Sequence, residues 1–112
     1  MDSARAALAD GDTKAARLHF EGAFKLVNEK AEPSEAYCKL GDGLPTFGDE
    51  MLAQGDASSA RIVYAYAIRT ARACGRSAEH IDGIRTRSTS AREVLLARKK
   101  AAKSASGAAK PR

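Results

Sequence analysis

The chain has 112 residues and a formal net charge of +5, with 44% hydrophobic and 29% charged residues and no tryptophan. This length allows one domain with its own core, and the richness in alanine over aromatic residues favours closely packed helices. No run of about 18 apolar residues occurs, which excludes a membrane-spanning helix, and the opening residues lack the apolar stretch of a secretory signal. The sequence therefore predicts an all-α, cytoplasmic protein.

The charge is divided unevenly along the chain. Residues 1–56 carry 6 Lys or Arg against 11 Asp or Glu, whereas residues 57–112 carry 13 against 3. The two halves therefore have net charges of −5 and +10. This polarity suits an acidic partner, nucleic acid, a membrane surface or head-to-tail self-association, and it leaves these alternatives open.

A sequence repeat begins near the N-terminus. Residues 8–24, LADGDTKAARLHFEGAF, align without a gap with residues 52–68, LAQGDASSARIVYAYAI, 44 positions later. In each copy, glycine followed by aspartate predicts the end of one helix and the N-cap of the next. The alanine and the aromatic residue that follow put a small and a large side chain on one helix face, so that two helices can pack closely. The repeat predicts two antiparallel helical hairpins, with turns at Gly11-Asp12 and Gly55-Asp56.

These residues resemble the tetratricopeptide pattern W-x2-L-G-x2-Y followed by A-x3-F. The second copy reads LPTFGDEM over residues 44–51 and ARIVY over 60–64, and the first copy reads ARLHF over 16–20. The resemblance covers residues 1–75 and implies a right-handed stack of two hairpins that binds another protein. It also implies a partner-binding groove at the positions that match Arg5, Asp49 and Leu52.

The segment between the two copies contains glycine and proline. We expect Ser34 to cap an elongated helix over residues 35–54. That helix should be broken or kinked around Gly41 to Pro45, because proline lacks a backbone donor and glycine is flexible. The alternative is a loop here, with the second hairpin starting at Pro45.

Cys38 and Cys74 are the only cysteines, and neither belongs to a CxxC pair. In a reducing compartment they are expected to be buried free thiols, with a disulfide between them as the alternative.

The C-terminal third is predicted to cover the open face of the second hairpin. Ser77 should cap a helix that weakens over residues 86–90, TRSTS, and a separate short helix should follow Ser90 over 91–101. The apolar residues for this contact are Ile81, Ile84, Val94 and Leu95. From residue 102 onward the sequence is small, polar and basic, which predicts disorder.

The expected organisation is therefore two helix-turn-helix repeats over residues 1–75, a capping helix or helices over 76–101 and a disordered basic tail over 102–112.

Four arginines are spaced for one helix face. At 100° per residue they fall within an arc of about 80°. These residues are Arg61, Arg69, Arg72 and Arg76. They form either a solvated face paired with acids or an anion-binding edge. The positive charge continues in the tail through Arg98, Lys99, Lys100, Lys103, Lys110 and Arg112.

No residue pattern in the sequence indicates a catalytic, metal-binding or cofactor-binding site. His19 and His80 lack a second ligand at helical spacing, and no nucleophile, phosphate-loop or dinucleotide motif occurs. We expect no enzyme, no metal and no cofactor. The predicted function is a protein–protein interaction scaffold or adaptor, in a larger assembly or through self-association. The alternative is binding of nucleic acid or another polyanion through the basic C-terminal half. In a nucleic acid the contacts would be made mainly to the phosphate backbone.

Overall fold

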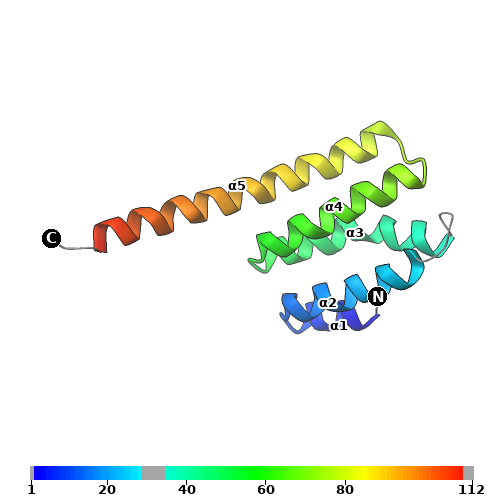
Figure 1. The fold of residues 1–112 in the computed structure, drawn as a ribbon, viewed down its shortest axis with the longest axis horizontal. Coiled ribbons are helices and arrows are strands. Elements are labelled where there is room, and N and C mark those ends of the chain that lie inside the picture. Colours follow the sequence, from blue (N-terminus) through cyan, green and yellow to red (C-terminus); the bar gives the residue numbers. More distant parts are fainter. Residues whose placement is uncertain (1, 29–34, 110–112) are drawn as a thin grey trace.

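The computed structural model describes the backbone of residues 2–28 and 35–109 and the side chains of residues 3–25 and 35–101. The described residues form helices and contain no strand, so the all-α prediction is confirmed. In chain order the helices are α1 (Asp2–Ala9), α2 (Thr13–Asn28), α3 (Glu35–Ala53), α4 (Ala57–Ala73) and α5 (Ala78–Ala109) (Figure 1). Helix α1 packs on α2, α3 packs on α4, and α5 lies along the outer side of α4.

The two Gly-Asp turns share one geometry. Gly11 and Gly55 have φ angles of +80° and +91°, in the left-handed region that favours glycine. In each turn the aspartate N–H donates to the carbonyl five residues back, at 2.9 Å for Asp12 and 3.0 Å for Asp56. Each aspartate carboxylate then accepts a hydrogen bond from the N–H three residues on, at 3.0 Å. Both predicted turns are confirmed.

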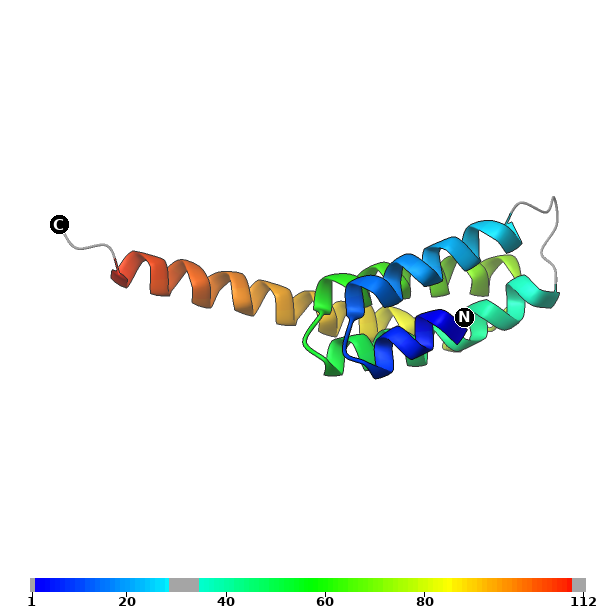
Figure 2. The same ribbon diagram turned by 90° about the horizontal axis from the view of Figure 1, so that it is seen from below.

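The two turns lie side by side at one end of the helix pairs (Figure 2). The Gln54 amide nitrogen donates to the carbonyl of Leu8 at 2.7 Å, and the Thr13 hydroxyl donates to the carboxylate of Asp56. Burial by itself raises the pKa of the Asp56 carboxyl. The hydrogen bonds from Thr13 and from the backbone and side chain of Ser59 outweigh burial, so the pKa is lowered.

Replacing Asp56 with asparagine is expected to flatten the acid side of the stability profile. The folded-state pKa of Asp56 is lowered, so the carboxylate contributes stability that is present above about pH 4 and is lost as the pH falls through the folded-state pKa. Asparagine still accepts a hydrogen bond at an N-cap. Urea titrations from about pH 6 to about pH 3 should show a steeper loss of unfolding free energy for the wild type than for Asp56→Asn. Parallel losses would contradict this role.

Helix α3 runs without interruption from Glu35 to Ala53, with Pro45 inside it. The alternative of a loop before a hairpin that starts at Pro45 is therefore wrong, and the helix is not broken around Gly41 to Pro45. The kink that was the other expectation for this stretch stays a prediction. Proline leaves a carbonyl one turn earlier without its helical donor, but the buried Pro45 ring packs inside the fold, which helps to offset this cost. The expected cap at Ser34 lies outside the described residues.

Two glycines let α3 lie close against α4. Gly41 and Gly48 are seven residues apart and share one face of α3. A Cβ atom at Gly41 would overlap the side chain of Thr70, and one at Gly48 would lie 2.6 Å from Cε1 of Tyr64. These glycines therefore permit close helix packing instead of interrupting the helix.

A cluster of aromatic rings joins the two helix pairs. The ring centroids of neighbouring members lie between 4.6 and 6.0 Å apart, in tilted or edge-to-face arrangements that aromatic pairs prefer. The cluster comes from α2, α3 and α4 and consists of Phe20, Phe24, Tyr37, Phe47 and Tyr66.

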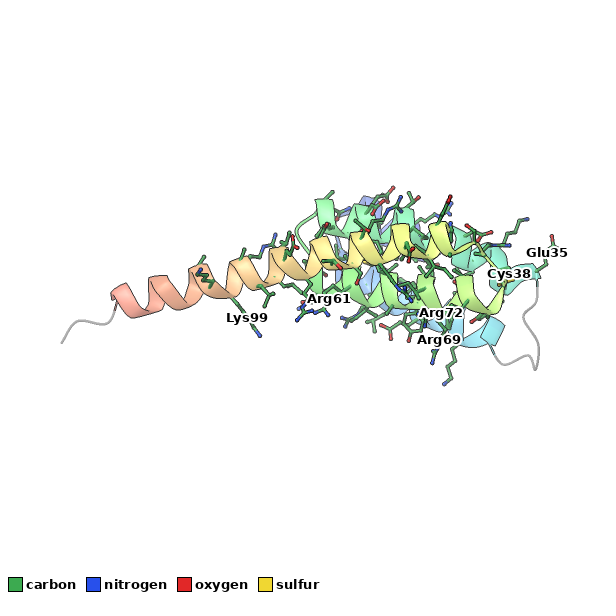
Figure 3. All side chains as sticks on the ribbon, turned by 90° about the horizontal axis from the view of Figure 1, so that it is seen from above. Glu35, Cys38, Arg61, Arg69, Arg72 and Lys99 are labelled. Carbon is green, nitrogen blue, oxygen red and sulfur yellow. A yellow bond between two sulfur atoms is a disulfide. The ribbon has the colours of Figure 1, made fainter. Side chains whose placement is uncertain are left out.

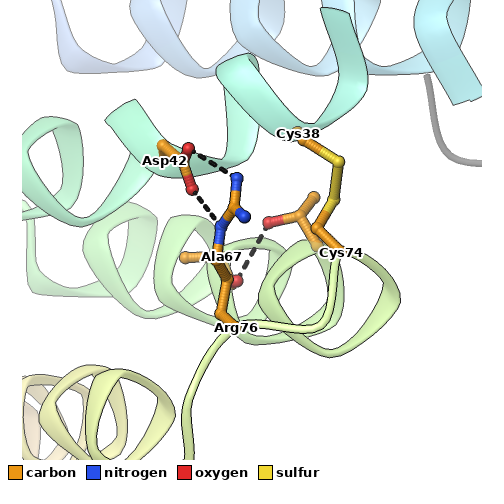
Figure 4. The surroundings of a disulfide bond; sticks show 6 residues. Cys38, Asp42, Ala67, Cys74 and Arg76 are labelled. Atoms are coloured by element: carbon orange, nitrogen blue, oxygen red, sulfur yellow. Dashed lines mark hydrogen bonds and ion pairs between the residues drawn. A yellow bond between two sulfur atoms is a disulfide. The ribbon is translucent and has the colours of Figure 1, made fainter. Parts of the chain in front are cut away.

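A disulfide joins Cys38 of α3 to Cys74, the residue that follows α4 (Figure 4). The expectation of free thiols is therefore wrong. The two cysteines are 36 residues apart in sequence, but the packing of α3 on α4 brings their Cα atoms to 5.9 Å, a separation that a disulfide spans. The bond fixes the end of α4 to the beginning of α3.

Helix α5 is continuous where the sequence predicted a weak stretch and a second helix. It begins as predicted, because the Ser77 hydroxyl accepts a hydrogen bond from the N–H of His80 at 3.1 Å. It then passes through residues 86–90 and 91–101 as one element. Ile84 and Ala91 are buried on the side that packs on α4, so tertiary contact maintains the helix across this polar stretch.

The predicted disordered tail is helical as far as Ala109, and residues 110–112 lie outside the described part. Alanine has the highest helix propensity and dominates residues 101–109, which favours continuation of α5. At 32 residues α5 is about 48 Å long, and its last part extends away from the other helices (Figure 1). None of the described helices is both long and apolar enough to span a membrane.

Candidate protein-interaction surface

Three arginines lie exposed along one face of α4. Arg61, Arg69 and Arg72 follow the predicted spacing, and within the described part of the chain none of them has an ion pair. Their positions span about 16 Å along the helix axis. Figure 3 shows their side chains on the same side of the molecule as that of Lys99 from α5. We call these four residues the basic face. Its cations have no acidic partner among the described residues, which favours contact with an anionic group.

Arg76 does not belong to this face, which corrects the prediction of a four-arginine edge. Helix α4 ends at Ala73, so the helical spacing no longer applies at residue 76. The Arg76 guanidinium instead donates to both carboxylate oxygens of Asp42, at 2.9 and 2.8 Å, beside the disulfide (Figure 4). These hydrogen bonds and the charge of Asp42 raise the pKa of Arg76. Arg76 therefore has a structural partner on α3.

A groove of about 300 Å³ lies between the beginning of α4 and the middle of α5. No carboxylate lines it, and Leu96 beside it has 53% of its surface exposed. Three cations and two leucines therefore meet in one open groove. The groove is lined by Ser58, Arg61, Arg92, Leu95, Leu96 and Lys99.

The contribution of α5 to this groove follows from helical spacing. Arg92, Leu95, Leu96 and Lys99 stand at i, i+3, i+4 and i+7, which places them on one face of a helix. The sequence prediction did not include Arg92 or Leu96 among the site residues, although the helix predicted over residues 91–101 contains both. The i, i+3, i+4, i+7 pattern was the available signal.

The predicted basic tail divides into different roles. The Arg98 guanidinium donates to the carbonyl of Gly55 at 2.6 Å, so this residue fastens α5 to the turn before α4. Lys99 and Lys100 are exposed. The side chains of Lys103, Lys110 and Arg112 lie outside the described residues.

The three residues of the predicted partner-binding groove have different surroundings. Arg5 is exposed on α1 and lines a hollow of about 390 Å³ against α3. The Asp49 carboxylate accepts a 2.6 Å hydrogen bond from Tyr64 and forms a 3.3 Å ion pair with Arg87 of α5. Burial raises the pKa of the Tyr64 hydroxyl, and Asp49 raises it further. Leu52 packs partly buried against the core. Asp49 and Leu52 thus hold helices together.

A second hollow, of about 380 Å³, lies beside the basic face between α2 and α4. Arg69 and Lys25 supply positive charge there, and Phe24 and Tyr66 supply aromatic surface. Glu21 at its border pairs with Arg17 at 3.3 Å. Apolar side chains thus accompany the basic face near both of its ends.

Within the described residues, no group of three or more His, Cys, Asp and Glu side chains is placed to hold a metal ion. Comparison with known proteins found no match among protein-family models, curated proteins or solved structures.

Proposed function

We propose that this chain is a protein-binding module, a scaffold or adaptor that works within a larger assembly and catalyses no reaction. The observation that carries the proposal is the groove between α4 and α5, where two leucines lie among three cations that have no ion pair among the described residues. Such a mixture suits a protein surface, because apolar contact supplies affinity and charge supplies orientation and association rate.

The tetratricopeptide-like repeat adds to this proposal. Two helix pairs with the same Gly-Asp turn present helix faces on a compact support, and stacked helix pairs commonly bind proteins through such faces. Two pairs are fewer than the three usually needed for an independent array, so docking into an assembly, or self-association, suits this length.

Binding of nucleic acid or another polyanion is the second candidate, and the basic face favours it. Arg61, Arg69, Arg72 and Lys99 lie on one side of the molecule with no acidic partner among the described residues. Contacts of this kind with phosphates are independent of sequence and weaken steeply with salt. Phosphate contacts give the two leucines of the groove no role. We therefore rank nucleic-acid binding below protein binding.

The disulfide provides an indication of the compartment in which the protein works. Disulfides persist in oxidising environments and are rare in the cytosol. The Cys38–Cys74 bond therefore favours an oxidising compartment over the cytoplasm expected from the sequence.

The triple variant Arg61→Ala/Arg69→Ala/Arg72→Ala separates the two functions. We expect the wild type to bind a labelled DNA duplex no tighter than about 1 µM at physiological salt, the range of nonspecific contact. After nuclease treatment, wild-type chain should still capture a protein whose purified form binds directly and crosslinks to α4 or α5. The matched control is Lys14→Ala/Lys39→Ala/Arg85→Ala, which removes the same charge from other exposed positions.

Nanomolar DNA binding that the triple variant abolishes and the control retains would replace protein binding with the second candidate.

A further inference from the structure

We infer that the groove between α4 and α5 receives an acidic amphipathic helix of another protein, with leucine-type side chains against Leu95 and Leu96 and carboxylates against Arg61, Arg92 and Lys99. This inference rests on the proposed protein-binding function and names the chemistry of its partner.

Charge complementarity identifies the partner as acidic. Arg61 comes from α4, whereas Arg92 and Lys99 come from α5, so the three cations stand on both walls of the groove. No carboxylate lines the groove. A basic or neutral partner would leave these charges near a partly dehydrated interface without partners, which is costly.

The leucines require an apolar stripe on the same partner. Leu96 is 53% exposed and Leu95 is partly buried beside it, between the two cations of α5. A helix that carries apolar residues at i, i+3, i+4 and i+7 fills a groove between two helices, and its flanking positions carry the acids. The open form of the groove suits such a helix better than an enclosed small molecule.

A second copy of this chain fits less well. Among the described residues, the other exposed large apolar side chain is Leu18 of α2. Lys14 stands one helical turn before it, and the nearby Glu21 already pairs with Arg17. The surface around Leu18 is therefore not acidic. For this reason a different protein complements the groove better than a second copy of this chain does.

Fluorescence anisotropy with synthetic probes tests this inference on the full chain. The main probe is a peptide of about 18 residues, long enough to form a helix, with leucines at i, i+3, i+4 and i+7 and glutamates elsewhere. Matched probes replace either all leucines with serine or all glutamates with glutamine. A DNA duplex and anionic vesicles serve as the other anionic probes.

We expect the main probe to bind about tenfold or more tighter than either half-probe, because apolar and charged contacts are both needed. Leu96→Ser should weaken it about tenfold, whereas the control Leu18→Ser, on another exposed leucine, should not. Arg92→Ala/Lys99→Ala should weaken it about tenfold and reduce its salt dependence, whereas Lys14→Ala/Lys39→Ala should not. Circular dichroism of each variant should show unchanged helix content, which excludes unfolding as the cause.

Equal binding of the serine half-probe, or tighter binding of duplex or vesicles, would overturn the inference. An effect of Leu96→Ser on self-association, with no effect on the peptide, would also overturn it. If the peptide responds to Arg69→Ala/Arg72→Ala and not to Leu96→Ser, this groove is the wrong place while the proposed protein-binding function stands. If no protein probe binds and no protein is captured, both proposals fail.

Discussion

Gly48→Ala is expected to lower the free energy of unfolding by about 2 kcal/mol, although alanine is the better helix former. The new methyl group would meet Cε1 of Tyr64 at 2.6 Å, and the Tyr64 ring is fully buried. The ring cannot easily retreat, because its hydroxyl donates a 2.6 Å hydrogen bond to Asp49. The overlap should therefore push α3 away from α4 and cost more than the helix propensity that alanine adds.

Gly22→Ala is the matched control. Gly22 also lies inside a helix, but no atom outside its own helical backbone and chain neighbours lies within 4 Å of the position its Cβ would take. The higher helix propensity of alanine is not opposed by a steric clash at this position. The free energy of unfolding should therefore rise by up to about 1 kcal/mol. Urea titrations of both variants measure the two shifts. A gain from Gly48→Ala would contradict the close approach of α3 and α4. A loss from Gly22→Ala would show that the control does not isolate helix propensity.

Removal of the disulfide is expected to cost about 3 to 4 kcal/mol of unfolding free energy. Cys38 and Cys74 close a loop with a sequence separation of 36, and this link restricts the unfolded chain. Cys38→Ser/Cys74→Ser should therefore unfold at a much lower denaturant concentration than the oxidised wild type.

Reducing agent supplies the internal control. It should lower the stability of the wild type to nearly that of the double variant and leave the variant unchanged. Non-reducing mass spectrometry verifies the redox state of each sample. An oxidised wild type that is no more stable than its reduced form would contradict the constraint exerted by this bond.

The local features of the fold could be predicted from the sequence. A Gly-Asp pair carries both the left-handed residue and the N-cap, so each turn depends only on its own neighbours. The small repeat positions Ala16 and Ala60 are both fully buried, as their helical spacing indicated. The residues next to each turn, and the spacing along a single helix, were sufficient to predict these features.

Features that depend on a distant helix could not be predicted. Gly41 resembles a helix breaker until Thr70 of α4 is placed against it. The pairing of two cysteines 36 residues apart depends on the packing of α3 on α4. The polar stretch of residues 86–90 stays helical because α5 rests on α4.

The candidate surface shows the same division. The exposed face of Arg61, Arg69 and Arg72 followed from spacing along one helix. Arg76 failed the same rule because α4 ends before it. Leu96 and Arg92 enter the groove only once α5 continues past Ser90 beside α4.

We propose that a protein partner binds at the groove between α4 and α5, and nuclear magnetic resonance of the ¹⁵N-labelled chain can locate this contact residue by residue. The acidic amphipathic peptide is titrated at physiological salt, and the shifted backbone amides are assigned. We expect saturable shifts centred on residues 58–61 and 92–99, which surround the groove, and no comparable change around Arg5 on α1. Shifts centred on α1 and α2, or none that saturate, would contradict it.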